Sequence, residues 1–263
     1  MSKDRDIGLF IIGDEILSGR RQDKHFSKVV EMLKQRGLQL SWAMILPDDL
    51  EVLVRAFNKT LEAGDIVFSC GGIGATPDDK TREAIAKALG VPLELHPEAE
   101  KLISERFITL AKEGRGSWDP GSPENQRRLA MGVFPEGAEI VPNPYNQIPG
   151  FFIQDHTFVP GFPEMAWPML EWTLDHRYAD MQRQALTHLS VIAYYLPESR
   201  ITPALEYIEL HWPGVHTFSL PTVPRDDQPG FIDLGVKGPE TLVHEAFDYL
   251  KGQVLREGGR FKA

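Results

Sequence analysis

The stretch from residue 66 to residue 81 limits the possible folds of this chain more than any other. It starts as the apolar run Ile66-Val67-Phe68, turns through Gly71-Gly72-Ile73-Gly74 and then carries Asp78 and Asp79. Such a run is typical of a buried strand, and glycine lets the backbone turn tightly. A helical pattern, residues 82–89, follows. This order predicts an α/β fold with an anion site at the turn, where backbone N–H groups and the positive helix end face a phosphate.

The glycine turn matches neither of the two common phosphate-binding motifs. No Gly-Lys-Ser/Thr follows it, as a P-loop requires. Pro77 stands where the third glycine of a dinucleotide-binding fingerprint would be, and the turn follows a late strand rather than the first. A plain tight connection between strand and helix therefore remains an alternative to a binding turn.

The first 112 residues alternate between strand-like and helix-like patterns. Apolar runs predict strands at 7–12, 38–46, 66–68 and 91–95, and apolar spacings of three and four predict helices at 23–35, 47–61, 82–89 and 97–112. The first three strands and their helices give the order βαβαβα, which forms a parallel sheet with right-handed crossovers. We therefore predict a three-layer α/β/α domain with a mostly parallel sheet.

The pattern changes near residue 175, where we place a domain boundary. The first domain, residues 1–174, is completed by a strand at 137–142, a hairpin from 151–154 and 157–159, and a helix toward Leu174. The second, residues 185–263, has strands at 189–196, 215–223 and 231–236 and helices at 198–211 and 239–256. This βαββα order predicts a small α+β domain.

Composition argues against several classes of partner. The net charge is −10 and no basic stripe is present, so nucleic acid is not expected. No run approaches the roughly 18 apolar residues of a membrane helix, and the charged residues 1–6 show no secretory signal. Cys70 is the only cysteine, which excludes an intrachain disulfide. We expect a cytoplasmic protein in which Cys70 is a small buried hydrophobe.

Acidic residues follow two of the predicted strands. Asp14 and Glu15 come directly after strand 7–12, and Asp78 and Asp79 follow the glycine turn. Because carboxyl ends of parallel strands meet at one edge of a sheet, these acids and the Pro160-Gly161 turn are expected to converge. One or two carboxylates plus substrate phosphates can hold Mg²⁺, which would position water for attack on phosphorus. Helix capping is the alternative role for the acids, and the two roles are compatible.

Other catalytic signatures are missing from the sequence. The histidines do not stand at metal-ligand spacing, since Trp212-Pro213-Gly214 separates His211 from His216, and zinc is not expected. No nucleophile elbow or other triad signature is present.

Several separated motifs give roughly the first 172 residues a resemblance to the molybdopterin-binding domain of molybdenum-cofactor biosynthesis, most closely in its form in CinA (competence-damage-inducible) proteins. The matching segments are Gly13-Asp14-Glu15-Ile16-Leu17-Ser18-Gly19 with Asp23, Pro47-Asp48-Asp49, Gly71-Gly72-Ile73-Gly74 with Thr76, Asp78-Asp79-x-Thr81, Asn125-Gln126, Asn143-Pro144, Pro149-Gly150-Phe151 and Pro160-Gly161-x-Pro163-x-Met165.

The resemblance implies a fold related to MogA and MoaB proteins and a homo-oligomer, a dimer or trimer. The second domain resembles the KH-like module of CinA proteins, although it lacks a Gly-x-x-Gly nucleic-acid clamp. The third CinA domain, the nicotinamide-mononucleotide deamidase, has no counterpart in the sequence, so that activity is not expected.

The resemblance also implies a phosphorylated small-molecule ligand. One function is hydrolysis of a nucleotide diphosphate such as ADP-ribose, with Mg²⁺ or another divalent cation. The second is binding of molybdopterin or its adenylated form without catalysis, and the third is a scaffold with a vestigial site.

Site residues follow from these functions. The predicted catalytic residues are Asp14, Glu15, Asp78 and Asp79, of which Asp14, Glu15 and Asp78 would hold the metal. The predicted ligand- and phosphate-binding residues are Gly13, Ser18, Gly71, Gly72, Gly74, Thr76, Thr81, Asn143, Pro149, Gly150, Pro160 and Gly161.

Three positions depart from the family pattern. Ala75 stands where the family usually has proline, and His25 where it commonly has asparagine. The loop residues Asn146-Gln147-Ile148 replace Gly-Thr-Ala, which removes a flexible glycine and a hydroxyl group.

Overall fold

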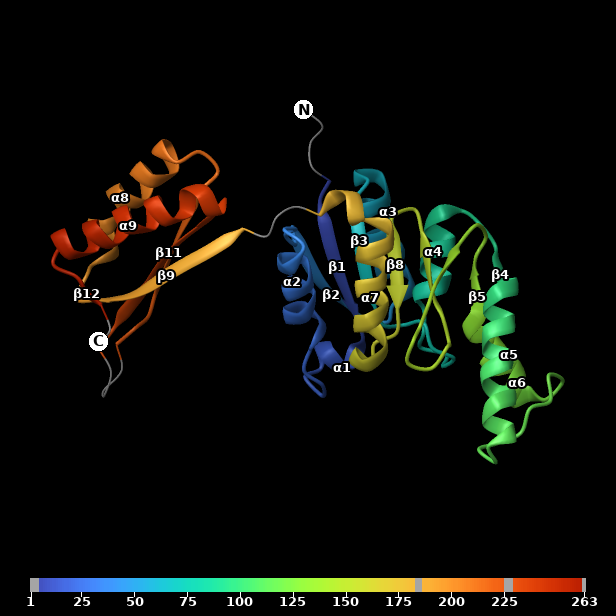
Figure 1. Ribbon diagram of the computed structural model, residues 1–263. Coiled ribbons are helices and arrows are strands. Elements are labelled where there is room, and N and C mark those ends of the chain that lie inside the picture. Colours follow the sequence, from blue (N-terminus) through green and yellow to red (C-terminus); the bar gives the residue numbers. More distant parts are fainter. Residues whose placement is uncertain (1–4, 183–185, 225–228, 262–263) are drawn as a thin grey trace. The chain divides into compact units, whose positions relative to one another are not determined.

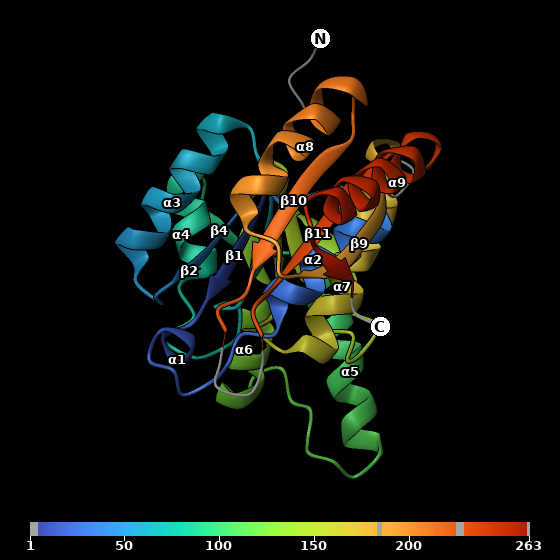
Figure 2. The same ribbon diagram turned by 90° about the vertical axis from the view of Figure 1, so that its left-hand side faces the viewer.

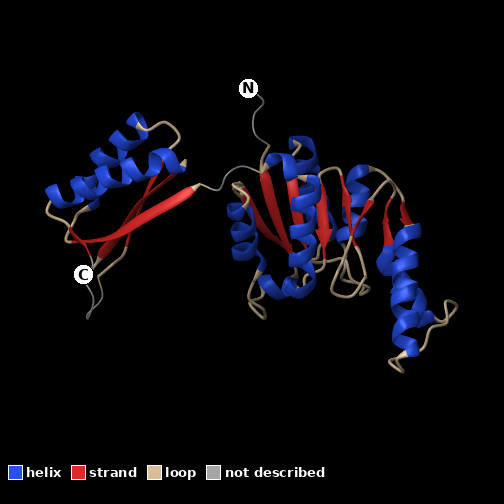
Figure 3. Ribbon diagram, in the orientation of Figure 1, coloured by secondary structure: helices blue, strands red, loops and turns tan. Residues whose placement is uncertain are grey.

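The computed structural model describes residues 5–182, 186–224 and 229–261. Its contacts divide the chain into unit 1, Met1–Arg183, and unit 2, Gln184–Ala263. The predicted fold class is confirmed, because unit 1 has a mostly parallel sheet between helices and unit 2 has a smaller antiparallel sheet with helices (Figure 3). We describe each unit by itself.

The sheet of unit 1 has the strand order β2-β1-β3-β8-β7-β6. Its strands are β1 (Ile7–Ile12), β2 (Trp42–Leu46), β3 (Ile66–Cys70), β6 (Glu139–Val141), β7 (Gly150–Ile153) and β8 (His156–Val159). The first four in spatial order are parallel, and the predicted hairpin forms the antiparallel pair β7–β8. Strands β1 and β3 lie side by side at the centre, so their carboxyl ends, Ile12 and Cys70, open at the same edge.

Helices cover both faces of this sheet (Figures 1 and 2). Helices α2 (His25–Gln35) and α7 (Pro163–Arg177) pack on one face, and α3 (Leu50–Ala63) and α4 (Thr81–Leu89) on the other. The short helix α1 (Asp14–Leu17) follows β1 directly. Helix α2 begins two residues later than predicted because both Asp23 oxygens accept hydrogen bonds from the first helical N–H groups, those of His25 and Phe26.

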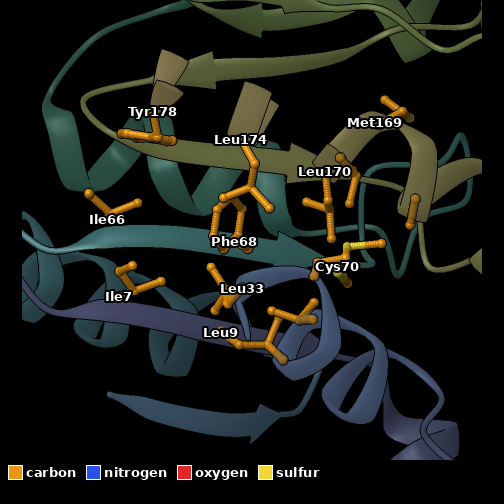
Figure 4. Packing of buried hydrophobic residues seen from close by; sticks show 14 of the residues in the cluster. Ile7, Leu9, Leu33, Ile66, Phe68, Cys70, Met169, Leu170, Leu174 and Tyr178 are labelled. Atoms are coloured by element: carbon orange, nitrogen blue, oxygen red, sulfur yellow. The ribbon is translucent and has the colours of Figure 1, made fainter. Parts of the chain in front are cut away.

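Alternating residues of the central strands point to opposite faces, as the period of a strand requires. Figure 4 shows the α2/α7 side, where Leu9 and Phe68 of the sheet meet Leu33, Leu174 and Tyr178. Cys70 is buried in the same cluster, as predicted, and burial raises the pKa of its thiol.

A helical excursion leaves the sheet between β3 and β6. It contains β4 (Leu93–Leu95), α5 (Pro97–Lys112), α6 (Pro123–Leu129), the 3₁₀ turn η1 (Ala130–Gly132) and β5 (Val133–Pro135), with β4 and β5 paired antiparallel. Helix α5 has the predicted bounds. The sequence pattern did not predict α6, a two-turn helix that Ser122 caps by accepting a hydrogen bond from Asn125 N–H.

Unit 2 has the predicted elements and one more. They are β9 (Thr187–Tyr194), α8 (Glu198–His211), β10 (His216–Pro221), β11 (Phe231–Gly238), α9 (Glu240–Arg256) and β12 (Arg260–Phe261). The extra strand β12 pairs with the end of β9, so the order is βαββαβ, the split-βαβ arrangement of ferredoxin-like folds. Unit 1 ends with α7 and the 3₁₀ turn η2 (Ala179–Met181). Within the described parts of the chain, no helix combines the length and apolar character needed to cross a membrane.

Phe68 tests the central packing of unit 1. Its side chain is buried and lies edge-on to the Tyr178 ring at 6.4 Å. Replacing Phe68 by alanine should lower the free energy of unfolding by about 3–5 kcal/mol, because it removes transfer energy and leaves a cavity. Urea unfolding followed by fluorescence measures the change. The exposed Leu17→Ala should stay within about 0.5 kcal/mol of the parent, and equal losses for both variants would contradict this packing.

Candidate functional site

A cleft of about 540 Å³ opens at the carboxyl ends of β1 and β3. Its lining comes from the residues after β1 and α1, the residue after β2, the glycine turn after β3 and the turn after β8. The lining residues are Ile12, Gly13, Glu15, Arg20, Arg21, Asp48, Gly71, Gly72, Thr76, Asp78, Asp79, Gly161 and Phe162. Segments far apart in the sequence thus meet at one edge of the sheet, where open α/β folds bind ligands.

The turn after β3 can be built only from glycine. Gly71 and Gly72 have φ angles of +109° and +68°, which side chains rarely adopt. A Cβ on Gly71 would lie 2.2 Å from the carbonyl oxygen of Ile12, and one on Gly72 would lie 2.2 Å from Thr81 Oγ1. The predicted ligand residues Gly71 and Gly72 therefore present bare backbone to the cleft.

Thr81 fixes the conformation of this turn through two hydrogen bonds. Its hydroxyl donates to the Gly71 carbonyl at 3.1 Å, and its N–H donates to the Gly72 carbonyl at 3.1 Å. Among the described residues, none accepts a hydrogen bond from the N–H groups of Gly72 and Ile73. Thr81 does not line the cleft, but it fixes the turn through which Gly72 does.

Asp79 shapes the next part of the turn. Its carboxylate accepts hydrogen bonds from Gly74 N–H at 2.8 Å, Thr76 N–H at 2.8 Å and the Thr76 hydroxyl at 2.6 Å. Arg82 supports the turn from the side by donating to the Gly74 carbonyl and, at 2.7 Å, to the Ala130 carbonyl. Asp79 is thus occupied by its own loop, although it reaches the cleft.

Asp78 is the exposed acid of the pair. The Thr76 side chain beside it and its own backbone N–H lower the pKa of the Asp78 carboxyl, so it carries its charge at neutral pH. It faces Glu15 and Asp48 within the same cleft.

Asp48 and Asp14 bind each other's backbone. Asp14 N–H donates to Asp48 Oδ2 at 3.0 Å, and Asp48 N–H donates to Asp14 Oδ1 at 3.4 Å. Burial raises the pKa of Asp48, and the negative charges of Asp14, Glu15 and Asp78 raise it further. Four carboxylates therefore crowd one end of the cleft. Asp14 itself does not line it.

The acidic residues of the cleft do not form a closed cage. Over residues 5–182, 186–224 and 229–261, no three His, Cys, Asp or Glu side chains converge as a preformed metal cage. Glu15, Asp48 and Asp78 nevertheless line one cleft beside free backbone donors. This donor set fits a cation of the Mg²⁺ type, which one or two carboxylates and the phosphates of a ligand hold together.

Two arginines and a phenylalanine line the cleft although the sequence patterns did not predict them as site residues. Arg20 and Arg21 follow the Ser18-Gly19 turn, and Phe162 follows Gly161 with 53% of its surface exposed. The adjacent Arg-Arg pair after a predicted site motif was the available signal. Asp48 was also missed, because Pro47-Asp48-Asp49 indicated a helix start; Asp49 does cap α3, accepting from Val52 N–H at 2.9 Å.

His25 connects the Gly161 turn to helix α2. Its Nε2–H donates to the Gly161 carbonyl at 3.1 Å, while its Nδ1 is buried and receives no hydrogen bond from the described residues. A Cβ on Gly161 would lie 3.6 Å from Gly71 Cα, and Gly71 N–H donates to Val159 O at 3.0 Å, so the two turns are neighbours. Burial lowers the pKa of His25, partly offset by the Gly161 carbonyl and the Asp23 charge.

The remaining predicted residues lie outside the cleft lining. Ser18 donates to the Glu15 carbonyl at 3.4 Å, and Pro160 precedes the turn. Asn143 holds its own loop by donating to Ile148 O at 2.9 Å. Pro149 follows in that loop, and Gly150 is packed so closely that a Cβ would lie 2.2 Å from Phe158 O. Gly74 does not line the cleft either.

The three departures from the family pattern differ in their relation to the site. Ala75 and residues 146–148 do not line the cleft. His25 acts on it through the Gly161 carbonyl. The replacement of residues 146–148 therefore does not alter the surface of the cleft directly.

Fold and cleft together define an α/β domain with an open cleft at the carboxyl edge of a mostly parallel sheet. The chain belongs to the molybdopterin-binding domain family, because residues 8–179 match the family described as probable molybdopterin binding domain.

Relatives support this assignment. A CinA-like protein of Anaeromyxobacter dehalogenans is 32% identical over 239 residues, covering 84% of this chain and 55% of the relative. A protein of Pyrobaculum arsenaticum is 30% identical over 215 residues, covering 80% of this chain and 77% of the relative. The chain spans about half the length of the CinA-like relatives it matches.

A solved structure supports the fold. The crystal structure of CinA from Thermoplasma acidophilum, a protein of unknown function, aligns with a TM-score of 0.55 and 26% identity, covering 65% of this chain and 98% of that one.

The glycine turn yields a stability prediction with an internal control. Gly72 and Gly90 have nearly equal φ angles, +68° and +70°, but only Gly72 lacks room for a Cβ. Gly90→Ala should cost about 1–2 kcal/mol through its backbone conformation, and Gly72→Ala about 1–3 kcal/mol more through overpacking against Thr81. Thermal or urea unfolding measures both, and equal costs would show that the Thr81 contact is not tight.

His25 yields a pH prediction. Burial lowers its pKa below the ordinary 6.5, so below pH 6.5 the unfolded chain binds more protons and the native state loses stability. Asn at this position can keep a donor to Gly161 without titrating. His25→Asn should therefore show a smaller fall in unfolding free energy between pH 7 and pH 5. His156, whose pKa burial also lowers, keeps part of the fall in both proteins, and identical pH profiles would count against a neutral buried His25.

Proposed function

We propose that the protein binds a small molecule that carries both phosphate and a heterocycle, and that it hydrolyses the diphosphate of a nucleotide such as ADP-ribose with a divalent cation. The observation that carries the proposal is the cleft itself. The bare backbone turn Gly71–Gly72 faces it together with Glu15, Asp78 and the pair Arg20-Arg21.

The cleft separates its charges in the way such a ligand needs. The N–H group of Gly72 and the two arginines offer donors and positive charge to phosphate oxygens. The crowded carboxylates, whose repulsion contributes to the raised pKa of Asp48, would gain from a cation. A diphosphate with its cation supplies both signs at once, whereas a bare phosphate would be repelled.

The protein groups then have separate tasks in hydrolysis. Glu15 and Asp78 would hold the cation, which when bound neutralises phosphate charge and makes its water more acidic. The glycine turn would orient the diphosphate, and Arg20 or Arg21 would stabilise charge that develops on its oxygens. A water oxygen forms a bond to one phosphorus and the bridging P–O bond breaks. ADP-ribose thereby gives AMP and ribose 5-phosphate.

A second function is binding of a molybdopterin without turnover. The family match over residues 8–179 favours it. Both functions use the same cleft, because both ligands carry phosphate and a heterocycle.

Turnover of nucleotide diphosphates tests the first function. The assay presents ADP-ribose and related diphosphates with Mg²⁺, Mn²⁺ or Co²⁺, and phosphatase coupling detects the released monophosphates. We expect divalent-dependent release that falls by about 100-fold or more in Glu15→Gln with Asp78→Asn, because charge stabilisation of the transition state is lost.

The control is Glu62→Gln, an exposed acid at the far end of α3, which should keep full activity. If no diphosphate is turned over with any of the three metals, the hydrolase proposal is wrong. Uptake of a pterin or adenylated pterin in calorimetry would then establish the second function, and no uptake would leave the scaffold.

A further inference from the structure

A second cleft of about 470 Å³ adjoins the first. Four residues line both clefts, namely Glu15, Arg21, Gly161 and Phe162. The residues that line only the second come from the end of α1, the segment before α2 and the start of α7; they are Ile16, Gln22, Asp23, Lys24, His25, Pro163 and Glu164. The shared wall makes the two clefts neighbouring parts of one elongated depression.

The second cleft differs in chemistry from the first. Ile16, Phe162 and Pro163 give it apolar walls, and the carboxylates of Glu15 and Glu164 and the amide of Gln22 supply polar atoms. Its three acids slightly outnumber its two cations, Arg21 and Lys24. This mixture suits an uncharged planar group with N–H donors rather than a phosphate.

The helix start beside this cleft is also unavailable to an anion. Both oxygens of Asp23 already accept hydrogen bonds from the first N–H groups of α2, at 2.8 Å from His25 and 3.0 Å from Phe26. The positive end of α2 is therefore neutralised by the protein's own carboxylate. Phosphate has free backbone donors at the glycine turn instead.

Phe162 lies where the two clefts meet. It precedes the first residue of α7, lines both clefts, and leaves 53% of its surface exposed. An aromatic face in this place can stack on a heterocycle that enters the second cleft. The bond from His25 to the Gly161 carbonyl holds the residue before Phe162 in position.

We propose that the second cleft binds the heterocycle of a ligand whose phosphates lie at the glycine turn, with Phe162 and Gly161 between the two parts. This inference rests on the proposed function, because it places the phosphates in the first cleft. It makes the ligand two-headed, a planar heterocycle joined to a diphosphate or phosphate. A nucleotide base and a pterin share this chemistry.

The test fills the second cleft and leaves the first intact. Gln22 is exposed and lines only the second cleft, so Gln22→Trp should block it without loss of folding. Ser27→Trp, at an exposed position of α2 outside both clefts, is the matched control. Calorimetry in the presence of Mg²⁺ measures binding of a pterin that carries one phosphate, and of ADP-ribose and inorganic pyrophosphate, the last two as methylene-bridged analogues that cannot be hydrolysed.

We expect Gln22→Trp to weaken binding of the heterocyclic ligand by about tenfold or more and to change pyrophosphate binding less than twofold, while Ser27→Trp changes neither. The ligand that loses affinity, ADP-ribose or the pterin, identifies the source of the heterocycle. Unchanged binding of both, or an equal loss for pyrophosphate, would overturn the inference. Failure of the unaltered protein to bind pyrophosphate and both ligands would instead defeat the proposed function.

Discussion

The site depends on the two hydrogen bonds from Thr81 to the carbonyls of Gly71 and Gly72. These bonds fix the turn after β3. The N–H groups of Gly71 and Gly74 are bonded to Val159 O and Asp79 Oδ1, whereas among the described residues those of Gly72 and Ile73 have no acceptor. The positive φ angles of this turn favour glycine, and a Cβ added at Gly71 or Gly72 would lie 2.2 Å from Ile12 O or Thr81 Oγ1. The geometry of the turn is therefore set by the backbone when unit 1 folds.

The carboxylates and arginines around the turn are held less tightly. Asp79 is fully engaged with residues 74–76, and Asp14 and Asp48 bind each other's N–H groups. Glu15 and Asp78 line the cleft together with Arg20 and Arg21, which are opposite in charge. The acids of the sequence motifs therefore divide into some that build the loops and some that are open to a ligand. Residue type alone does not separate them.

Much of the fold followed from sequence because apolar periodicity reports burial directly. The run Ile66-Val67-Phe68 and the spacing in 97–112 each met a simple rule, and β3 and α5 formed there. Helix α6 and strand β12 were not predicted, because seven and two residues are too few to show an apolar periodicity. Convergence of strand ends placed Glu15, Gly72, Asp78 and Gly161 at one cleft, while their roles stay predictions. The positions of Phe162 and Arg21 in the cleft lining could not be predicted, because the direction of a side chain in a turn leaves no periodic pattern in the sequence.

The contact between the Gly71 turn and the Gly161 turn joins two crossings of the chain that lie ninety residues apart in sequence. A Cβ on Gly161 would already touch Gly71 Cα, and His25 anchors the Gly161 carbonyl from α2. Gly71 N–H donates to Val159 O at 3.0 Å, so backbone meets backbone along this seam between the two turns. New ligand preferences in proteins of this design would have to arise on either side of the seam, at positions such as 20, 22 and 162. The seam itself, being backbone, sets the distance between the two clefts.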